Sequence, residues 1–439
     1  MKYKLLFLTA AILLSAQLRG YAQEKPEDSR LNYFLTKDHK RFVKVSGYME
    51  LWARYTNMNP GTMINNSQVN SASDLSMRRL RIKATIQATD KFLVIVQMGP
   101  SNVNINTKTN TYMDLLDAYG EYKFNNYIAV GGGRSTWRGL TRFSTGPAAT
   151  LLYDMPAFAT ANAGISDITV RMFSLYAKGD IGKFDYRVAV ADPYTDAETV
   201  PKLNQSVFNT SAPAKLFSGY FKWAFYDKES NVTPFMAGTY LGKKRVFNLG
   251  IGGEYQKNAL WHTTALGDTV QSHMKNLAAD VFYDVPLNKK RGTSLSIYGM
   301  AMKSDYGKNY IRMIGTNNPG TGVNSSLASY NGAGNAYPVI GTGYTYYLQV
   351  GGTLPYFNQN KKGAQLLPAA SVQYSRFEKL ADPMVAVDAG VSLLLHGHAS
   401  KFTFDVQSRP IYDNPESAFS KADYMERKLT YLLKYRVDF

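Results

Sequence analysis

The sequence lacks cysteine altogether and has no long uninterrupted apolar segment after its N-terminus. In an exported protein the absence of cysteine excludes a disulfide framework, so stability depends on hydrogen bonding and burial. Because no segment approaches about 18 consecutive apolar residues, helices that span a membrane are not expected. Trp is scarce, with 4 residues, whereas Tyr (32), Phe (22) and Gly (35) are abundant. This composition favours β-structure whose aromatic rings lie at a membrane–water boundary.

Signatures of catalysis and metal binding are missing as well. Neither G-x-S-x-G nor H-E-x-x-H occurs in the sequence. His396 and His398 are separated only by Gly397, and such a triplet is more often a tight turn than a weak metal site. We therefore expect no enzymatic activity, no metal site and no cofactor.

The N-terminus has the features of a secretory signal. Two lysines precede the apolar run Leu5–Ala16, and Gly20 and Ala22 supply the small residues of a cleavage site. The apolar run is too short to span a bilayer. We predict a signal peptide over residues 1–22, followed by a charged, aperiodic periplasmic extension over residues 23–40.

The chain carries a surplus of positive charge, +17 at pH 7 from 50 Lys and Arg against 33 Asp and Glu. Such a surplus indicates an anionic partner, which is nucleic acid, lipopolysaccharide or a small anion. An exported protein rarely meets nucleic acid, so nucleic acid is not expected. Lipopolysaccharide and small anions remain.

The last residues carry the strongest single pattern. The apolar and aromatic residues Leu429, Tyr431, Leu433, Tyr435, Val437 and Phe439 alternate with Thr430, Leu432, Lys434, Arg436 and Asp438. A strand points successive side chains to opposite faces, so one face suits lipid and the other suits water. A soluble β-sandwich also shows such alternation, but rarely ends the chain on Phe. We predict an outer-membrane β-barrel over residues 41–439. Tyr431, Leu433, Tyr435, Val437 and Phe439 would be the signal read by the barrel assembly machinery.

The same period of two recurs near residue 80. Arg79, Arg81 and Lys83 alternate with Leu80 and Ile82. A Lys or Arg facing lipid near the bilayer midplane costs roughly 2–4 kcal/mol. The three cations are therefore expected to face the lumen of the barrel.

Connections between the expected strands alternate between short and long. Tight turns are expected at Thr89–Lys91, Asn125–Asn126, Asp180–Lys183, Pro286–Gly292 and His396–Ser400, and long loops at Asn57–Ser73, Gly99–Thr111, Arg134–Asp167, Gln256–Ser272, Gly307–Gly341 and Arg409–Glu426. The raw pattern gives one strand too many for both chain ends to lie on the periplasmic side. Val232–Leu241 is the weakest candidate because Pro234 disfavours a fully paired strand. Without it the prediction is 16 antiparallel strands, with 18 as the alternative.

Several segments resemble the phosphate-selective porin O and P family. They are MRRLRIKATIQATDKFLVIVQMG at Met77–Gly99, LLDAYGEYKF at Leu115–Phe124, YIAVGGGR at Tyr127–Arg134 and FDYRVAVAD at Phe184–Asp192. The resemblance implies a homotrimer of 16-stranded barrels, each with a pore narrowed by inward-folded loops. It also implies rows of Arg and Lys in the pore that select phosphate, and Arg79, Arg81 and Lys83 are similar to part of such a row.

The loop Arg134–Asp167 is where the pore is expected to narrow. Arg134, Arg138 and Arg142 are spaced four apart, and together they would make a focused positive field that concentrates anions. Alternatively, they bind lipopolysaccharide phosphates or pair with carboxylates in the lumen.

Asp117 and Glu121 are expected to face the lumen and to oppose these cations. The sequence thus predicts an outer-membrane porin for passive diffusion of small hydrophilic solutes, with a preference for anions. The alternatives are a plugged structural or adhesion barrel and a barrel-embedded lipid hydrolase. A sugar or organic-acid channel would use Tyr48, Tyr119, Tyr220 and Tyr298 as an aromatic track, although wall packing is the simpler role for them.

Overall fold

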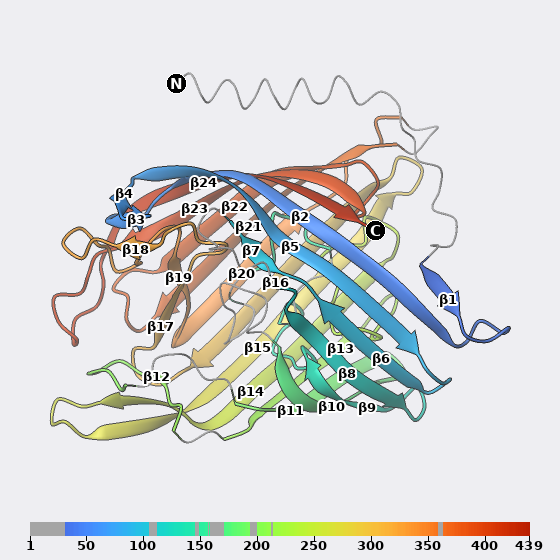
Figure 1. Ribbon diagram of the computed structural model, residues 1–439, viewed down its shortest axis with the longest axis horizontal. Helices are drawn as coiled ribbons and strands as arrows, with labels where there is room; N and C mark the ends of the chain where they lie inside the picture. The colour runs from blue at the N-terminus through green and yellow to red at the C-terminus, as the bar shows by residue number, and fades with distance from the viewer. Residues whose placement is uncertain are drawn as a thin grey trace.

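The computed structural model describes residues 31–104, 112–144, 149–156, 158, 171–193, 200–211, 214–358 and 363–439. Over these residues the chain forms a closed antiparallel barrel of 16 strands (Figure 1). Within the described ranges, no helix is long and apolar enough to cross a membrane. The barrel strands are β2 (Phe42–Asn57), β5 (Ser71–Gln87), β6 (Phe92–Met98), β8 (Leu115–Lys123), β9 (Ala129–Ser135), β10 (Met172–Ile181), β11 (Phe184–Ala191), β13 (Leu216–Ala224), β14 (Val246–Thr263), β15 (Thr269–Asn288), β16 (Thr293–Asp305), β20 (Gly343–Gly351), β21 (Gln365–Phe377), β22 (Met384–Leu394), β23 (Ser400–Tyr412) and β24 (Tyr424–Asp438).

The last strand closes the barrel against the first. β24 pairs with β2 from Tyr48 opposite Asp438 to Thr56 opposite Thr430. The Gly47 N–H donates to the Phe439 carbonyl oxygen at 2.7 Å, and the Phe439 N–H donates back at 2.9 Å. A short strand, β1 (Asn32–Phe34), pairs with the start of β2 within the expected N-terminal extension. We call the end of the barrel that holds Phe439 the terminal end, and the opposite end the loop end.

Most of the smaller strands lie at the loop end (Figure 1, left), whereas β7 lies against the middle of β5. β7 (Ser101–Val103) pairs with β5, and β12 (Val207–Phe208) pairs with β14. Two small sheets are formed by β17 (Ile311–Ile314) with β19 (Tyr337–Gly341), and by β3 (Thr62–Ile64) with β4 (Ser67–Gln68) and β18 (Gly322–Val323). The long connections therefore have secondary structure of their own.

The strand count expected from the sequence is confirmed, and one loop is corrected. Residues 232–241 form no strand, which restores the parity of the barrel. The expected long loop Gln256–Ser272 is wrong, because β14 and β15 continue as a hairpin beyond the barrel and leave only residues 264–268 as the turn. That hairpin carries many polar side chains, and a register shift between Gln256 and Leu260 interrupts its alternation, so the segment resembled a loop in the sequence.

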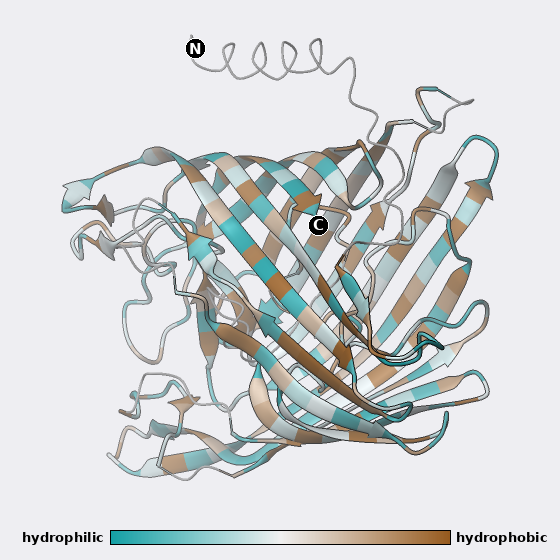
Figure 2. Ribbon diagram, turned by 45° about the vertical axis from the view of Figure 1, so that its right-hand side comes forward, coloured by the Kyte–Doolittle hydropathy of each residue, from teal (hydrophilic) through white to brown (hydrophobic). Residues whose placement is uncertain are grey.

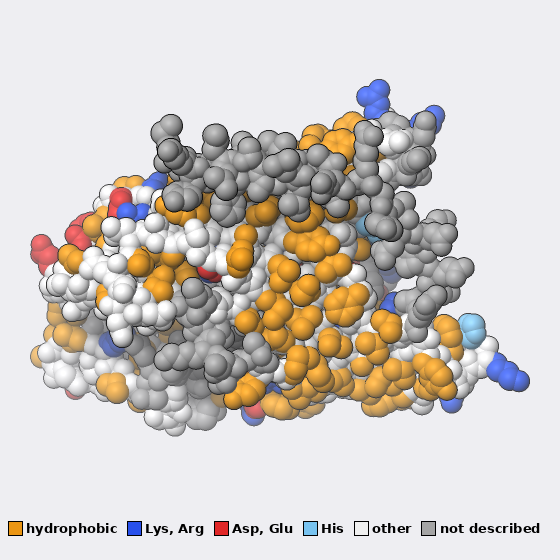
Figure 3. Space-filling model, turned by 45° about the horizontal axis from the view of Figure 1, so that its top comes forward, with side chains coloured by type: hydrophobic (Ala, Val, Ile, Leu, Met, Phe, Trp, Pro, Cys, Tyr) orange, Lys and Arg blue, Asp and Glu red, His pale blue; other side chains and the backbone are white. Residues whose placement is uncertain are grey.

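Hydrophilic and hydrophobic residues alternate along many of the barrel strands (Figure 2). On β14, Leu249 and Ile251 are exposed on the outer wall, whereas Asn248 and Glu254 are buried inside. The outward side chains form a broad apolar surface on the face shown in Figure 3. This arrangement is that of a transmembrane barrel, with an apolar outside and a polar lumen.

A β-bulge changes the face pattern of β5. Glu50 lies opposite Arg79, but Leu51 lies opposite Met77, so Arg78 is the extra residue. As a result Arg78 and Arg79 are both buried on the lumen side. The strict alternation expected from the sequence placed only Arg79 there.

The outward orientation of β14 can be tested with Ile251→Arg. Ile251 is 52% exposed on the outer wall and lies near the middle of the β13–β14 pairing. We expect the change to lower the free energy of unfolding in lipid vesicles by roughly 2–4 kcal/mol, because it places a charge in hydrocarbon. Leu266→Arg is the control, since Leu266 is 89% exposed at the tip of the projecting hairpin. Equal effects of the two changes would contradict the assigned orientation.

Candidate functional site

Two connections fold into the lumen from opposite ends of the barrel. Loop A (residues 136–171, between β9 and β10) enters from the loop end, and loop B (residues 225–245, between β13 and β14) enters from the terminal end. Phe143 of loop A and Met236 of loop B are 1% and 4% exposed. The described parts of both loops therefore pack against the barrel wall rather than project into solvent.

A bidentate ion pair joins loop A to loop B. The Arg142 guanidinium donates to Glu229 Oε1 at 2.5 Å and to Oε2 at 2.7 Å, and it also donates to the Ala237 carbonyl oxygen at 2.7 Å. The Tyr240 hydroxyl and the Lys222 ammonium donate to the same carboxylate at 2.7 and 3.2 Å. Bidentate Arg–carboxylate pairs have a fixed geometry, so this contact sets the position of each loop relative to the other.

Burial alone would raise the pKa of the Glu229 carboxyl. The Arg142 guanidinium and the Lys222 ammonium outweigh that effect and hold the pKa of Glu229 well below its ordinary value. A carboxyl group with a lowered pKa contributes its full stabilisation above its unfolded pKa, and loses it progressively as the pH falls from the unfolded to the folded pKa. The pair is therefore intact throughout the neutral and mildly acidic range.

Residues of the barrel wall also contact Arg142, in addition to those of loop B. Asp280 of β15 accepts the Arg142 backbone N–H at 2.6 Å and the Tyr220 and Tyr298 hydroxyls at 2.8 and 3.2 Å. The Phe282 ring lies 3.5 Å from the guanidinium carbon of Arg142. Tyr220 and Tyr298 thus hold the wall and the loop together, which is the packing role expected for them.

The far part of loop A is fixed to the opposite wall. Asp154 accepts from Arg78 at 2.8 Å and from Arg79 at 2.7 Å, both on β5. Lys434 of β24 donates to the Tyr153 carbonyl oxygen at 2.6 Å, and Lys401 of β23 donates to the Thr150 carbonyl oxygen at the same distance. Loop A is therefore anchored to both sides of the lumen.

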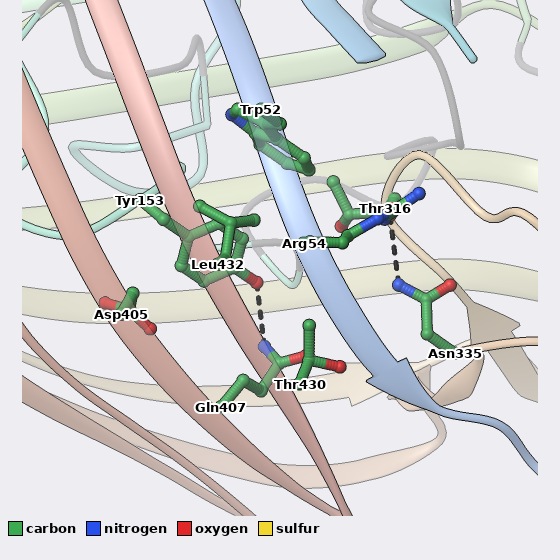
Figure 4. Close-up of a pocket in the computed structure, with 9 residues that line it drawn as sticks. All are labelled: Trp52, Arg54, Tyr153, Thr316, Asn335, Asp405, Gln407, Thr430 and Leu432. Carbon is green, nitrogen blue, oxygen red and sulfur yellow. Dashed lines mark hydrogen bonds between the residues drawn. The ribbon is translucent and has the colours of Figure 1, made fainter. Parts of the chain in front are cut away.

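Figure 4 shows where this anchored segment meets the loop-end connection between β16 and β20, which we call loop C (residues 306–342). The Tyr153 hydroxyl accepts from the Gln407 amide at 2.7 Å. Arg54 is paired with Asp74 at 2.6 Å and donates to the Thr316 carbonyl oxygen of loop C at 3.1 Å. The cavity between these groups is about 10 Å³, which is room for one water molecule.

The three cations that were expected to form a row on β5, Arg79, Arg81 and Lys83, differ in their partners. Arg79 is bound to Glu50 at 2.9 Å as well as to Asp154. Arg81 is buried and donates to the Leu80 and Pro100 carbonyl oxygens, each at 2.7 Å. Lys83 is half-buried and forms no ion pair with any residue in the described ranges.

The expected arginines of the constriction are not brought together. Arg134 is in register with Ala118 and Phe173, on the outward row of β9, and its Nε donates to the Leu116 carbonyl oxygen at 3.2 Å. Arg138 lies inside, 3.6 Å from Glu254, and is 2% exposed. With Arg142 paired to Glu229, the two inward arginines follow the alternative expectation of pairing with lumen carboxylates.

The expected lumen carboxylates also have partners. Asp117 is bound to Arg171 at 3.1 Å, and Glu121 to Lys178 at 2.8 Å, all of them buried. Arg171 was not predicted from the sequence, because no local pattern connects it to Asp117. Both ion pairs join β8 to residues at or near β10, across the intervening strand β9.

An aromatic cluster next to these pairs was not expected. Trp137 of loop A stacks on Tyr176 with ring centroids 5.1 Å apart, and the Lys178 ammonium lies 4.0 Å from the Trp137 ring centroid. A side chain at Gly131 would lie 2.3 Å from the Tyr176 hydroxyl oxygen. The run of three glycines before Arg134 is the sequence signal for this close approach.

Comparison with known proteins bears on the fold. No family model matches the sequence, and no curated protein matches it. OprB of Pseudomonas putida, in its high-pH structure, matches with a TM-score of 0.52 at 10% identity, covering 91% of this chain and 94% of that chain. OmpF of Salmonella typhi in complex with daunomycin gives a TM-score of 0.49 at 9% identity, covering 93% and 100%. The outer membrane channel DcaP of Acinetobacter baumannii gives 0.47 at 12% identity, covering 92% and 99%. At these identities the likeness to OprB shows a shared barrel fold.

The contact between loops A and B can be tested with Glu229→Ala. Removing one partner leaves Arg142 buried and uncompensated, so the free energy of unfolding should fall by about 3–5 kcal/mol. Urea titration followed by tryptophan fluorescence measures it. Asp192→Ala is the control, because its pair with Lys215 is exposed and such pairs contribute little. Replacing both partners with apolar residues, Arg142→Met with Glu229→Leu, should restore most of the loss. An effect no larger than that of the control would contradict the role of the pair.

Proposed function

We propose that the chain is an outer-membrane porin that lets small hydrophilic solutes diffuse passively, with a preference for anions. The observation that supports it most is a closed 16-strand barrel with an apolar outer wall and a charged lumen. When strands cross a bilayer, only a closed barrel gives every backbone N–H and C=O group a hydrogen-bond partner. The proposal includes export by the signal peptide over residues 1–22, which lies outside the described residues, and insertion through the C-terminal strand. It also includes a homotrimer, as the family resemblance implies.

Cations at the terminal end support the anion preference. Lys44, Lys83 and Lys123 lie on inward positions near the terminal ends of β2, β5 and β8, and none has an ion-pair partner among the described residues. A cavity of about 610 Å³ opens at this end, and its lining has four lysines, Lys91, Lys123, Lys178 and Lys228, against three carboxylates, Asp90, Glu121 and Asp180. Solvated, unpaired cations at a pore mouth raise the local concentration of anions. Phosphate is one such anion.

The dense lumen supports a second candidate, a plugged structural or adhesion barrel. The described parts of loops A and B pack inside the barrel, and the ion pairs at Arg54, Arg78 and Arg142 are almost wholly buried. A channel and a plug differ in one measurable property, which is steady conductance. Conductance therefore decides between them.

Single-channel recording in planar bilayers is the experiment. For a porin we expect steady openings, and in asymmetric KCl a reversal potential of the sign that marks anion selectivity. Millimolar phosphate should reduce the chloride current if phosphate shares the path. Correctly folded protein that gives no openings would favour the plugged barrel.

The triple variant Lys44→Glu, Lys83→Glu, Lys123→Glu tests where the selectivity arises. Because it reverses the charge of the pore mouth, we expect the reversal potential to change sign toward cation selectivity. Lys289→Glu, in the exposed turn between β15 and β16, is the control and should leave the potential unchanged. An anion-selective triple variant would place the selectivity elsewhere in the lumen.

A further inference from the structure

Three cations lie near one another on the outer wall of the barrel. Lys275 is on β15, Lys303 on β16 and Arg376 on β21, and all three side chains are exposed. Lys303 is in register with Tyr344 of β20, and Tyr344 with Arg376. Leu277, two residues from Lys275, is opposite Lys303. With neighbouring strands about 4.8 Å apart, the three backbone positions fall within roughly 15 Å of one another.

These side chains share their face with apolar residues. Leu277, Tyr344 and Tyr374 are exposed on the same rows, at 58%, 47% and 36%. The alternate positions Met274, Met302 and Ser375 are buried inside the barrel. The three cations therefore point away from the lumen, toward the surroundings of the barrel.

The cations lie at the loop end of the wall. Lys303 is two residues from the end of β16, and Arg376 is one residue from the end of β21. Tyr255, opposite Lys275, and Tyr344 lie at the same level, where aromatic rings mark the membrane interface. A cation on the lipid face costs roughly 2–4 kcal/mol at the midplane but only about 0–1 kcal/mol near the interface. This level of the wall is thus the level of lipid headgroups.

The three cations outnumber the two carboxylates near them, Asp305, which is in register with Lys275, and Glu378, two residues from Arg376. None of them forms an ion pair within the part of the chain that the structure describes; the Lys303 ammonium lies 5.7 Å from the Tyr344 ring centroid. The two nearest carboxylates by sequence and register, Asp305 and Glu378, instead accept the backbone N–H groups of Gly307 and Asn309 at 2.9 and 3.0 Å. Like charges held together beside an apolar surface repel one another, and a bound anion removes that repulsion.

We propose that Lys275, Lys303 and Arg376 form a binding site for the phosphate groups of an outer-leaflet lipid, the lipid A part of lipopolysaccharide. The Arg376 fork suits two phosphate oxygens, and the ammonium groups of Lys303 and Lys275 act as point charges on the β16 and β15 side of it. The neighbouring Leu277 and Tyr344 side chains offer apolar contact for acyl chains. Because the site lies on the convex wall, a lipid fits it better than a free ion. The proposal rests on the outer-membrane location proposed above, but not on an open pore.

Native mass spectrometry of the full-length protein in detergent, with diphosphorylated lipid A as the probe, tests the site. We expect Lys275→Gln, Lys303→Gln and Arg376→Gln each to weaken binding on the order of fivefold, since a basic residue near an anionic lipid surface contributes about 1 kcal/mol. The triple variant should lose most binding. Lys289→Gln, Lys290→Gln and Arg291→Gln together make the same charge change in the exposed turn between β15 and β16, and should leave binding unaltered.

Equal affinity in the triple variant and the control would overturn the site. So would equal binding of lipid A from which the phosphates have been removed, because acyl contacts would then suffice. Displacement of the lipid by millimolar inorganic phosphate would also overturn it, since the ligand would then be the free ion. Retained heat-modifiable mobility on gels shows that each variant is folded. Bilayer recordings on the same preparations report the pore separately, so loss of conductance with intact lipid binding contradicts only the proposed channel.

Discussion

Backbone hydrogen bonding is the constraint on which the rest of this structure depends. Strands in hydrocarbon have no water to satisfy their amide groups, so the sheet must close on itself. Here closure is the pairing of β24 with β2, sealed by the reciprocal bonds between Gly47 and Phe439. Once the sheet is closed, every second side chain of a strand points into the lumen. The charged side chains of neighbouring strands therefore lie close together there.

The lumen resolves this crowding by pairing. Buried Lys and Arg residues number 14 against 11 buried Asp and Glu in the described ranges, so most cations have a carboxylate within reach. The inward loops contribute to both sides of this balance: loop A supplies Arg142 and Asp154, and loop B supplies Glu229. The inward loops therefore take part in pairing the buried charges of the barrel wall.

The sequence predicted the fold better than the site, and the reason is physical. The alternation of side chains with a period of two is a local property of the sequence, so it predicted β24 and the inward face of Arg81. It also predicted the number of strands, once Val232–Leu241 was excluded because of Pro234. The bulge at Arg78 was not readable, because it depends on how β5 is registered against β2. The partners of Arg142 and Asp117 lie 87 and 54 residues away along the chain. No local pattern specifies contacts at such separations.

Lys401 and Lys434 belong to the last two strands, yet they hold the segment of loop A near residue 150. Loop A is synthesised long before its anchors exist. It can reach its final position only after the C-terminal strands are in place. Such long-range pairing is slow to form. A chain that ends early would lose the interior arrangement of its first half together with the missing wall.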